Sequence, residues 1–229
     1  MKIHLQFDMN EKLYLKNPEG SELGRKIVVN SIRLIYEIGF EKFNFKRLSA
    51  EVETTEAGIY RYFGNKHKLL IYLTNWYWNW LEYQIQSNIK SLNSSEEKLK
   101  KTIGLICSVD EQSITDSEMD EVKLHKIIIR EGTKTYLTQR VEKDNQDKLF
   151  KPYKDLCALI ANIIRSYDEK YKYSHSLAST LIEIAHFQTY FKKNLPALTD
   201  FNSNPDDHQD IIEFLEMMVF GQLDNQLSK

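Results

Sequence analysis

The chain contains few of the residues that interrupt helices. Its 229 positions include only 8 glycines and 4 prolines, and long stretches separate them. Beyond the first sixteen residues it also lacks the alternation of polar and apolar residues that favours strands. With 41% hydrophobic and 28% charged residues, the chain can bury one large core or two modest ones. We therefore expect an all-α protein.

Cysteine is equally scarce. Cys107 and Cys157 both fall in apolar helical patterns, so we expect two buried, reduced thiols; a redox-sensing pair is the alternative. The longest apolar-rich stretch, Leu69–Leu81, contains polar residues and is too short to cross a membrane. Met1–Asn10 does not run apolar as a signal peptide does. These absences predict a soluble, cytoplasmic protein without a membrane partner.

Metal and catalytic patterns are missing as well. No two of the six histidines are four residues apart, as a helical zinc pair would be, and no Cys-x-x-Cys occurs. The chain has no nucleophile elbow, P-loop or dinucleotide fingerprint. We therefore expect no metal, no cofactor and no enzymatic activity.

The charge is unevenly distributed. The formal net charge is −2, but residues 1–70 carry 12 Lys and Arg against 9 Asp and Glu, and the remainder carries 19 against 24. A basic end on an acidic body suits a protein that presents one end to phosphates. Because the asymmetry is modest, a monomer should bind DNA weakly and a dimer should be needed.

Residues 1–16 are the exception to the helical pattern. Ile3, Leu5 and Phe7 alternate with polar residues, and a second apolar group follows at Leu13–Leu15. This pattern predicts a short β-hairpin that packs on the body or on a partner subunit. The alternative is a minor-groove arm that uses the basic residues Lys2, Lys12 and Lys16.

The segment from Asn44 to Leu70 has the pattern of a helix-turn-helix. Phe45, Leu48 and Val52 share one helical face, and Thr54-Thr55 then interrupts the pattern and offers an N-cap. The short helix that follows carries Ile59 and Phe63 inward. Its other face holds Glu56, Ala57, Gly58, Tyr60, Arg61 and Tyr62, a mixture that suits a DNA major groove.

The remaining boundaries follow from caps and periodicity. The first helix should begin between Pro18 and Glu22, with Asn17 or Ser21 as its cap, and end at Gly39. A helix should run from about Asn65 to Ser91. Further helices are expected at about 95–109, 117–139, 144–167, 175–194 and 207–225, with Pro152 bending or starting a helix.

The amino-terminal residues resemble the TetR family of bacterial regulators. Its signature joins a first helix that ends in Gly-Phe to a helix-turn-helix and then to Tyr-x-x-Phe-x-x-Lys-x-x-Leu. This chain has Gly39-Phe40 and Tyr60-Arg61-Tyr62-Phe63-Gly64-Asn65-Lys66-His67-Lys68-Leu69, and the match covers about residues 22–70. The resemblance implies a three-helix DNA-binding domain at 17–66 and a larger helical effector-binding and dimerisation domain at 67–229, preceded by the extension 1–16.

The resemblance also implies roles for single residues. Tyr60 and Lys66 would contact phosphates, and Asn44 would cap the second helix and face the DNA backbone. Arg61 is the best candidate for a bidentate guanine contact. The positions that face the groove are Lys46, Thr55, Glu56, Ala57, Gly58, Arg61 and Tyr62. The alternatives are solvated charges at Lys46 and Lys66 and a packing role for Tyr60. Thr55 is expected to act first as a helix cap and second as a DNA contact.

Three positions depart from the family pattern. Glu53 stands in the turn where a glycine is common, so we expect it either to adopt the backbone that a glycine usually supplies or to reshape the turn. Gly58 lies inside a helix, where it costs about 1 kcal/mol relative to alanine, and close approach to DNA is one compensation. Glu56 could accept from a cytosine amino group or weaken non-specific affinity.

The carboxy-terminal part shows no subfamily signature. The resemblance implies that the helices at about Ser174–Asn194 and Asp207–Gln226 pair with their mates across a two-fold axis. The apolar positions that suit this are Leu177, Leu181, Ile184, Ala185, Ile211, Phe214, Leu215, Met218 and Val219, and an internal core is the alternative. Candidate pocket residues for a hydrophobic effector are Trp76, Trp80, Tyr83, Leu105, His125, Ile128, Ile129, Tyr136, Tyr153, Ile160, His186 and Tyr190, and ordinary core packing is the alternative.

The sequence thus predicts a homodimeric DNA-binding transcriptional regulator, a repressor released by a small hydrophobic effector. Its partners would be a double-stranded operator, a second copy of the chain and the effector. The alternative is a protein with this fold that binds ligands or other proteins and has lost specific DNA binding. Glu51, Glu53 and Glu56, which surround the recognition helix, favour that alternative.

Overall fold

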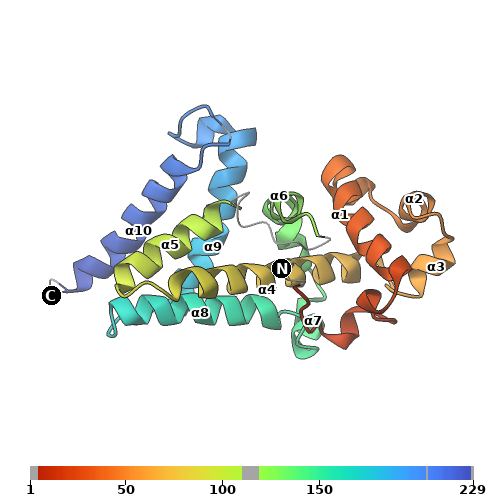
Figure 1. Ribbon diagram of the computed structural model, residues 1–229. Coiled ribbons are helices and arrows are strands. Elements are labelled where there is room, and N and C mark those ends of the chain that lie inside the picture. The colour runs from red at the N-terminus through yellow and green to blue at the C-terminus, as the bar shows by residue number, and fades with distance from the viewer. Residues whose placement is uncertain (1–4, 110–118, 205, 228–229) are drawn as a thin grey trace. The chain divides into compact units, whose positions relative to one another are not determined.

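The computed structural model describes residues 5–109, 119–204 and 206–227, and this part of the chain consists of helices and turns without strands (Figure 1). The predicted all-α class is confirmed. The chain forms two compact units, Met1–Asn79 with Ile114–Pro152, and Trp80–Ser113 with Tyr153–Lys229. Helix α4 (Lys66–Ile89) contributes residues to both. No helix in the described ranges is long and apolar enough to cross a membrane.

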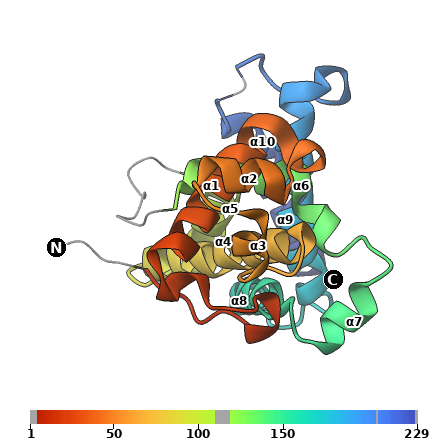
Figure 2. The same cartoon turned by 90° about the vertical axis from the view of Figure 1, so that its right-hand side faces the viewer.

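The first unit contains the predicted helix-turn-helix. Its helices are α1 (Glu22–Lys42), α2 (Phe45–Glu51), α3 (Glu56–Tyr60), the first part of α4, α6 (Glu121–Glu131) and α7 (Val141–Gln146), with 3-10 turns η1 (Glu11–Leu13), η2 (Pro18–Gly20) and η4 (Gly132–Thr135). Helix α2 contacts both α1 and α3 (Figures 1 and 2). Fully buried apolar side chains hold these helices together: Ile27, Ile35, Leu48, Ile59, Phe63 and Leu69.

The predicted start of α1 is confirmed, whereas the predicted end at Gly39 is a kink inside the helix. Asn17 caps η2, and Ser21 accepts a hydrogen bond from the Gly24 amide, 3.2 Å away, at the start of α1. Gly39 has a φ of 77°, which L residues rarely adopt, and a further helical turn ends at Lys42. The buried Glu131 carboxylate accepts from the Phe40 amide directly after this kink, at 3.2 Å, so the end of α6 fixes the end of α1.

Two long helices predicted from the sequence are shorter in the structure. The helix expected at 144–167 is divided into α7 and α8 (Lys151–Tyr167), because Lys148 has a φ of 59° and the chain turns there. Pro152 lies in the first turn of α8, where its missing amide hydrogen costs nothing, as predicted. The helix expected at 117–139 begins at Glu121 and continues from Gly132 only as η4; residues 117 and 118 lie outside the described ranges.

The predicted β-hairpin is not supported. The described residues 5–16 contain no strand; instead η1 forms, with the Asn10 side chain accepting from the Lys12 amide at 2.9 Å. Ile3, which the prediction also used, lies outside the described residues. Leu13 is 1% exposed, and Phe7 contacts Trp76 of α4, so the apolar side chains pack on the first unit without forming a ladder.

The second unit is built from the end of α4, α5 (Ser95–Cys107), α8, α9 (Ser174–Asn194), the 3-10 turn η5 (Pro196–Leu198) and α10 (Gln209–Leu227). Helices α5, α9 and α10 contact one another. Most of the apolar positions predicted for a dimer interface are buried inside the monomer: Leu177, Leu181, Ala185, Ile211, Leu215 and Val219. These residues pack as an internal core, which was the alternative, and a dimer interface on α9 and α10 stays a prediction.

Both cysteines are free and lie in the second unit. Burial raises the pKa of Cys107 to about 12 and that of Cys157 to about 11. Very little thiolate, the reactive form, is therefore present at neutral pH. This agrees with inert reduced thiols and gives no support to a redox pair.

Candidate DNA-binding interface

Helix α2 presents a basic outer face. The side chain of Asn44 accepts from the Arg47 amide at 2.9 Å and starts the helix, as predicted, while Phe45 and Leu48 point into the core. Lys46 and Arg47 are both exposed. Arg47 is absent from the predicted set, although the inward pattern of Phe45 and Leu48 would have assigned it to the outer face.

The turn between α2 and α3 uses Glu53 in a conformation usual for glycine. Its φ is 53°, and two backbone bonds close the turn, from the Val52 amide to the Leu48 carbonyl at 3.1 Å and from the Thr54 amide to the Ser49 carbonyl at 2.9 Å. Glu53 thus adopts the left-handed backbone that a glycine usually supplies, as expected, and this backbone is strained for an L residue.

Helix α3 presents the predicted groove-facing side chains. Thr55 accepts from the Gly58 amide at 3.1 Å and caps the helix, and Ile59 is completely buried. On the other side, Glu56, Ala57 and Arg61 are exposed. A short helix anchored by one buried residue and capped at its start leaves this face open to a partner.

The structure gives an intramolecular reason for Gly58. A Cβ atom at this position would lie 2.6 Å from Oγ1 of Thr54, far closer than van der Waals contact allows. Thr54 is β-branched and its χ1 angle is restricted, so the hydroxyl cannot easily move away. Close approach to DNA is not needed to explain the glycine.

Tyr60 is 48% exposed, and its ring meets the edge of Phe45 with 5.0 Å between the ring centroids. The contact holds the ring against α2, so Tyr60 has the packing role that was given as the alternative. Because half of the side chain stays exposed, the same residue is also available to a phosphate.

Tyr62 and Lys66 do not occupy the positions predicted for them. Tyr62 is 3% exposed, and its hydroxyl pairs with Ser21 Oγ at 2.8 Å, so it belongs to the core. The Lys66 ammonium donates to the carbonyls of Phe40, Glu41 and Phe43 at 3.0 to 3.3 Å. An ammonium has three donors, and all three serve the end of α1, so Lys66 has none left for a phosphate.

The acidic residues near α3 differ in their surroundings. Glu51 forms an ion pair with Arg33 of α1, which compensates its charge. Glu56 is exposed in the first turn of α3, where a carboxylate is favourable for the helix dipole. Of the three glutamates that favour the alternative without DNA binding, Glu51 is therefore paired with a cation and Glu56 stabilises α3.

The candidate pocket residues are divided between the two units. Trp76, His125, Ile129 and Tyr136, with Ile128, belong to the first; Trp80, Tyr83, Tyr153 and His186, with Leu105, Ile160 and Tyr190, belong to the second. In the first unit, His125 Nδ1 pairs with the Tyr77 hydroxyl at 2.6 Å. In the second, the Tyr153 hydroxyl donates to Glu183 at 2.7 Å, and burial lowers the pKa of His186 to about 4. The residues of both sets remain predictions for an effector pocket.

Metal ligation finds no support in the described ranges, where no cluster of three or more His, Cys, Asp or Glu side chains occurs. The exposed outer faces of α2 and α3, backed by buried apolar residues, suit a DNA-binding domain.

The comparisons with known proteins agree with this arrangement. Residues 27–73 match the model of the bacterial regulatory proteins of the tetR family. The first unit therefore contains a helix-turn-helix DNA-binding domain of a transcriptional regulator. Residues 27–73 thus correspond to the amino-terminal domain of the tetR family. No curated protein matches it.

Solved structures share the fold over most of the chain. AibR in complex with isovaleryl coenzyme A and operator DNA aligns with a TM-score of 0.60 and 18% identity, covering 87% of this chain and 98% of that one. The fatty acid degradation regulator FadR from Bacillus halodurans aligns with a TM-score of 0.59 and 15% identity, covering 88% and 96%. A TetR family protein from Vibrio parahaemolyticus reaches a TM-score of 0.52 at 16% identity, over 83% and 94%.

Proposed function

We propose that this protein is a homodimeric repressor that binds a near-palindromic operator and is released by a small hydrophobic effector. The observation that carries the proposal is the exposed face of α2 and α3. Caps at Asn44 and Thr55 fix this face, and buried apolar residues hold it from behind. Such a regulator acts in the cytoplasm, where the operator is.

The DNA contacts divide by chemistry. Lys46, Arg47 and Tyr60 are proposed to contact phosphates, which set the position of the helix but carry no sequence information. Arg61 is proposed to read a guanine, and Glu56 a cytosine amino group. Thr55, Ala57 and Gly58 complete the surface at the start of α3, and Asn44 faces the backbone.

Exposed apolar side chains on the last two helices support dimerisation there. Phe187 of α9 is 45% exposed, and Phe214 and Met217 of α10 are 37% and 72% exposed. Large apolar groups of this kind are enriched in the cores of protein interfaces. A two-fold dimer would present two α3 helices to half-sites about one turn of DNA apart.

The effector is proposed to be an acyl thioester or a similar apolar molecule, bound by the domain 67–229. One structural relative is described with isovaleryl coenzyme A, and another as a regulator of fatty acid degradation. The test is titration with isovaleryl coenzyme A, with free coenzyme A as control. A raised melting temperature and changed tryptophan fluorescence with the thioester alone are expected, whereas no response to either would exclude this class.

The test of DNA binding is selection of bound sequences from random DNA, followed by affinity measurements at several salt concentrations. An enriched inverted repeat with salt-dependent affinity supports the proposal. Equal affinity for all sequences, or none at low salt, would contradict it and favour the protein that has lost specific DNA binding.

A further inference from the structure

We propose that Lys16, at the end of the amino-terminal extension, contacts a DNA phosphate beside the recognition helix α3. The extension is defined here as residues 5–16, which precede the segment that matches the family model. The inference rests on the proposed DNA binding and adds a contact from outside the helix-turn-helix.

Apolar contacts fix the path of the extension along α4. Phe7 meets Trp76 with ring centroids 5.5 Å apart, and Tyr14 meets Tyr72 at 6.4 Å, both edge to face. Leu13 lies between them in the chain and is 1% exposed. These residues are held as core residues are, so the extension is a fixed part of the first unit.

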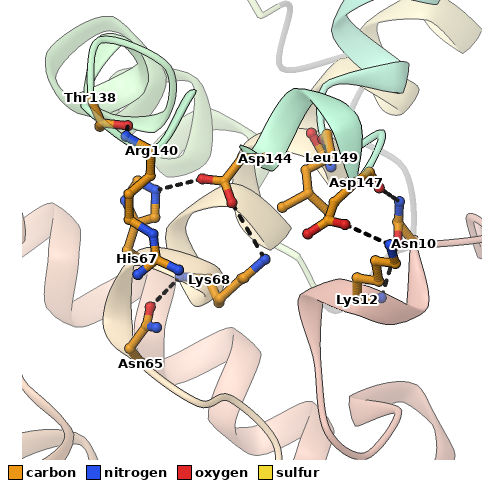
Figure 3. A network of polar contacts seen from close by, with 11 residues as sticks. Asn10, Lys12, Asn65, His67, Lys68, Thr138, Arg140, Asp144, Asp147 and Leu149 are labelled. Atoms are coloured by element: carbon orange, nitrogen blue, oxygen red, sulfur yellow. Dashed lines mark hydrogen bonds and ion pairs between the residues drawn. The ribbon is translucent and has the colours of Figure 1, made fainter. Parts of the chain in front are cut away.

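Polar contacts attach the extension to the segment that follows α7 (Figure 3). The Asn10 side chain donates to the Asp147 carbonyl at 2.9 Å, and the Lys12 ammonium lies 2.6 Å from the Asp147 carboxylate. In the same view the buried Asp144 lies 3.6 Å from His67 and 3.7 Å from Lys68, at the start of α4. Asp144 of α7 thus anchors the start of α4, and Asp147, directly after α7, anchors the extension.

The last anchor joins the extension to α3 itself. The Leu15 amide donates to the Tyr62 carbonyl at 2.8 Å, directly after the end of the recognition helix. Lys16 is exposed, and its ammonium lies 5.1 Å from the centre of the Tyr62 ring. Its neighbour in space is therefore the residue that follows Arg61, the proposed base reader.

The charges near Tyr62 favour a phosphate. Hydrogen bonds with Ser21 and Lys16, together with the charges of Lys16 and Arg61, lower the pKa of the Tyr62 hydroxyl, against the effect of burial. Two cations from distant parts of the sequence thus act on one point at the end of α3. Lys12, four residues earlier in the extension, differs from Lys16 because the Asp147 carboxylate already compensates its charge.

The test compares Lys16→Gln with Lys12→Gln, which removes the same charge from the same extension. For each variant, the affinity for a selected operator is measured between 50 and 200 mM salt. With Lys16→Gln, the slope of log affinity against log salt should fall in magnitude by about 0.9 per lost contact, or about 1.8 for a dimer. Lys12→Gln should keep the wild-type slope.

A second variant tests the positioning. Leu15→Pro removes the amide that bonds to Tyr62, and since the Leu15 side chain is 73% exposed, little packing is lost. It should reduce the slope as Lys16→Gln does, and the double variant should show no further reduction. Circular dichroism and melting curves confirm that each variant is folded.

The outcomes separate the two proposals. Wild-type binding with equal slopes for wild type and Lys16→Gln overturns the Lys16 contact alone. Equal losses with Lys12→Gln and Lys16→Gln also overturn it, because they indicate an effect of overall charge. A wild-type protein without salt-dependent affinity overturns the DNA-binding proposal as well.

Discussion

The exposed faces of the two units differ in chemistry. On α2 and α3 of the first unit, the exposed side chains are mostly polar or charged, and Asn44 and Thr55 fix the backbone beneath them. On α9 and α10 of the second unit, the exposed side chains include the large apolar residues Phe187, Phe214 and Met217. A hydrated, charged partner such as DNA suits the first face, and an apolar protein surface suits the second.

The same difference divides the proposed function into two tasks. The first face is expected to determine which DNA is bound, because base edges are read by polar groups at fixed positions. The second is expected to determine whether two such faces act together. The predictions below test this division, from the largest effect to the smallest.

Met217→Asp should disrupt the dimer. The new carboxylate would be removed from water at an apolar interface without a cation to pair with. The dimer dissociation constant should therefore rise by about 100-fold or more, a loss of roughly 3 kcal/mol in dimer stability. Analytical ultracentrifugation measures the change. Leu198→Asp is the matched control, because Leu198 is 61% exposed in the loop after α9. An unchanged dimer with Met217→Asp would refute the assignment of this face.

Acid should destabilise the second unit through His186. Burial lowers its pKa from 6.5 to about 4, so the folded form holds the neutral ring. The unfolded chain then binds more protons, and stability present above pH 6.5 is lost as the pH falls towards 4, by about 3 kcal/mol at most.

Urea unfolding between pH 7 and 4 tests this. His186→Gln should make the free energy of unfolding depend less on pH. His175→Gln, at an exposed position, should leave that dependence unchanged. Part of the slope should remain, because partial burial also lowers the pKa of His67, against the opposing effect of Asp144. An unchanged profile with His186→Gln would show that another group is responsible.

Gly58→Ala should destabilise the first unit by about 1–3 kcal/mol, because the new methyl group clashes with Thr54. In a Thr54→Ala background the same change should stabilise it by up to about 1 kcal/mol, since alanine favours helix more than glycine. A double-mutant cycle by urea unfolding measures the sign change. If both backgrounds give the same sign, the contact with Thr54 is not the reason for the glycine.

Glu53→Gly should have the smallest effect, a gain of about 1 kcal/mol or less. Glycine adopts the φ of 53° without strain, although it also loses more chain entropy on folding. Lys148→Gly is the matched control outside the helix-turn-helix, at a φ of 59°. Thermal unfolding of both should show similar gains. A loss at Glu53 alone would mean that its side chain stabilises the turn.

Local interactions made much of the first unit predictable. The caps at Asn44 and Thr55 and the inward positions Leu48 and Ile59 depend on neighbours within a few residues, and all are found in the structure. Tyr62 and Lys66 were misplaced because their partners, Ser21 and the carbonyls at the end of α1, are distant in sequence.

The second unit was harder for a related reason. Helix α10 is apolar on several sides, so periodicity does not show which side faces the core. Leu215 proved buried, while Met217, two residues on, is 72% exposed. The contacts of α10 with α5 and α9 determine which of these two residues is buried. The sequence of α10 alone does not predict those contacts.

Sequence selection with Arg61→Ala beside the wild type tests the central claim most directly. If α3 reads bases, the wild type should enrich an inverted repeat, and Arg61→Ala should lose preference at one base pair in each half-site while the rest remains. The structure allows this comparison because Arg61 is exposed at the end of α3 and not part of the core. The same repeat with undiminished preference in the variant, or no enriched sequence with the wild type, would contradict the account.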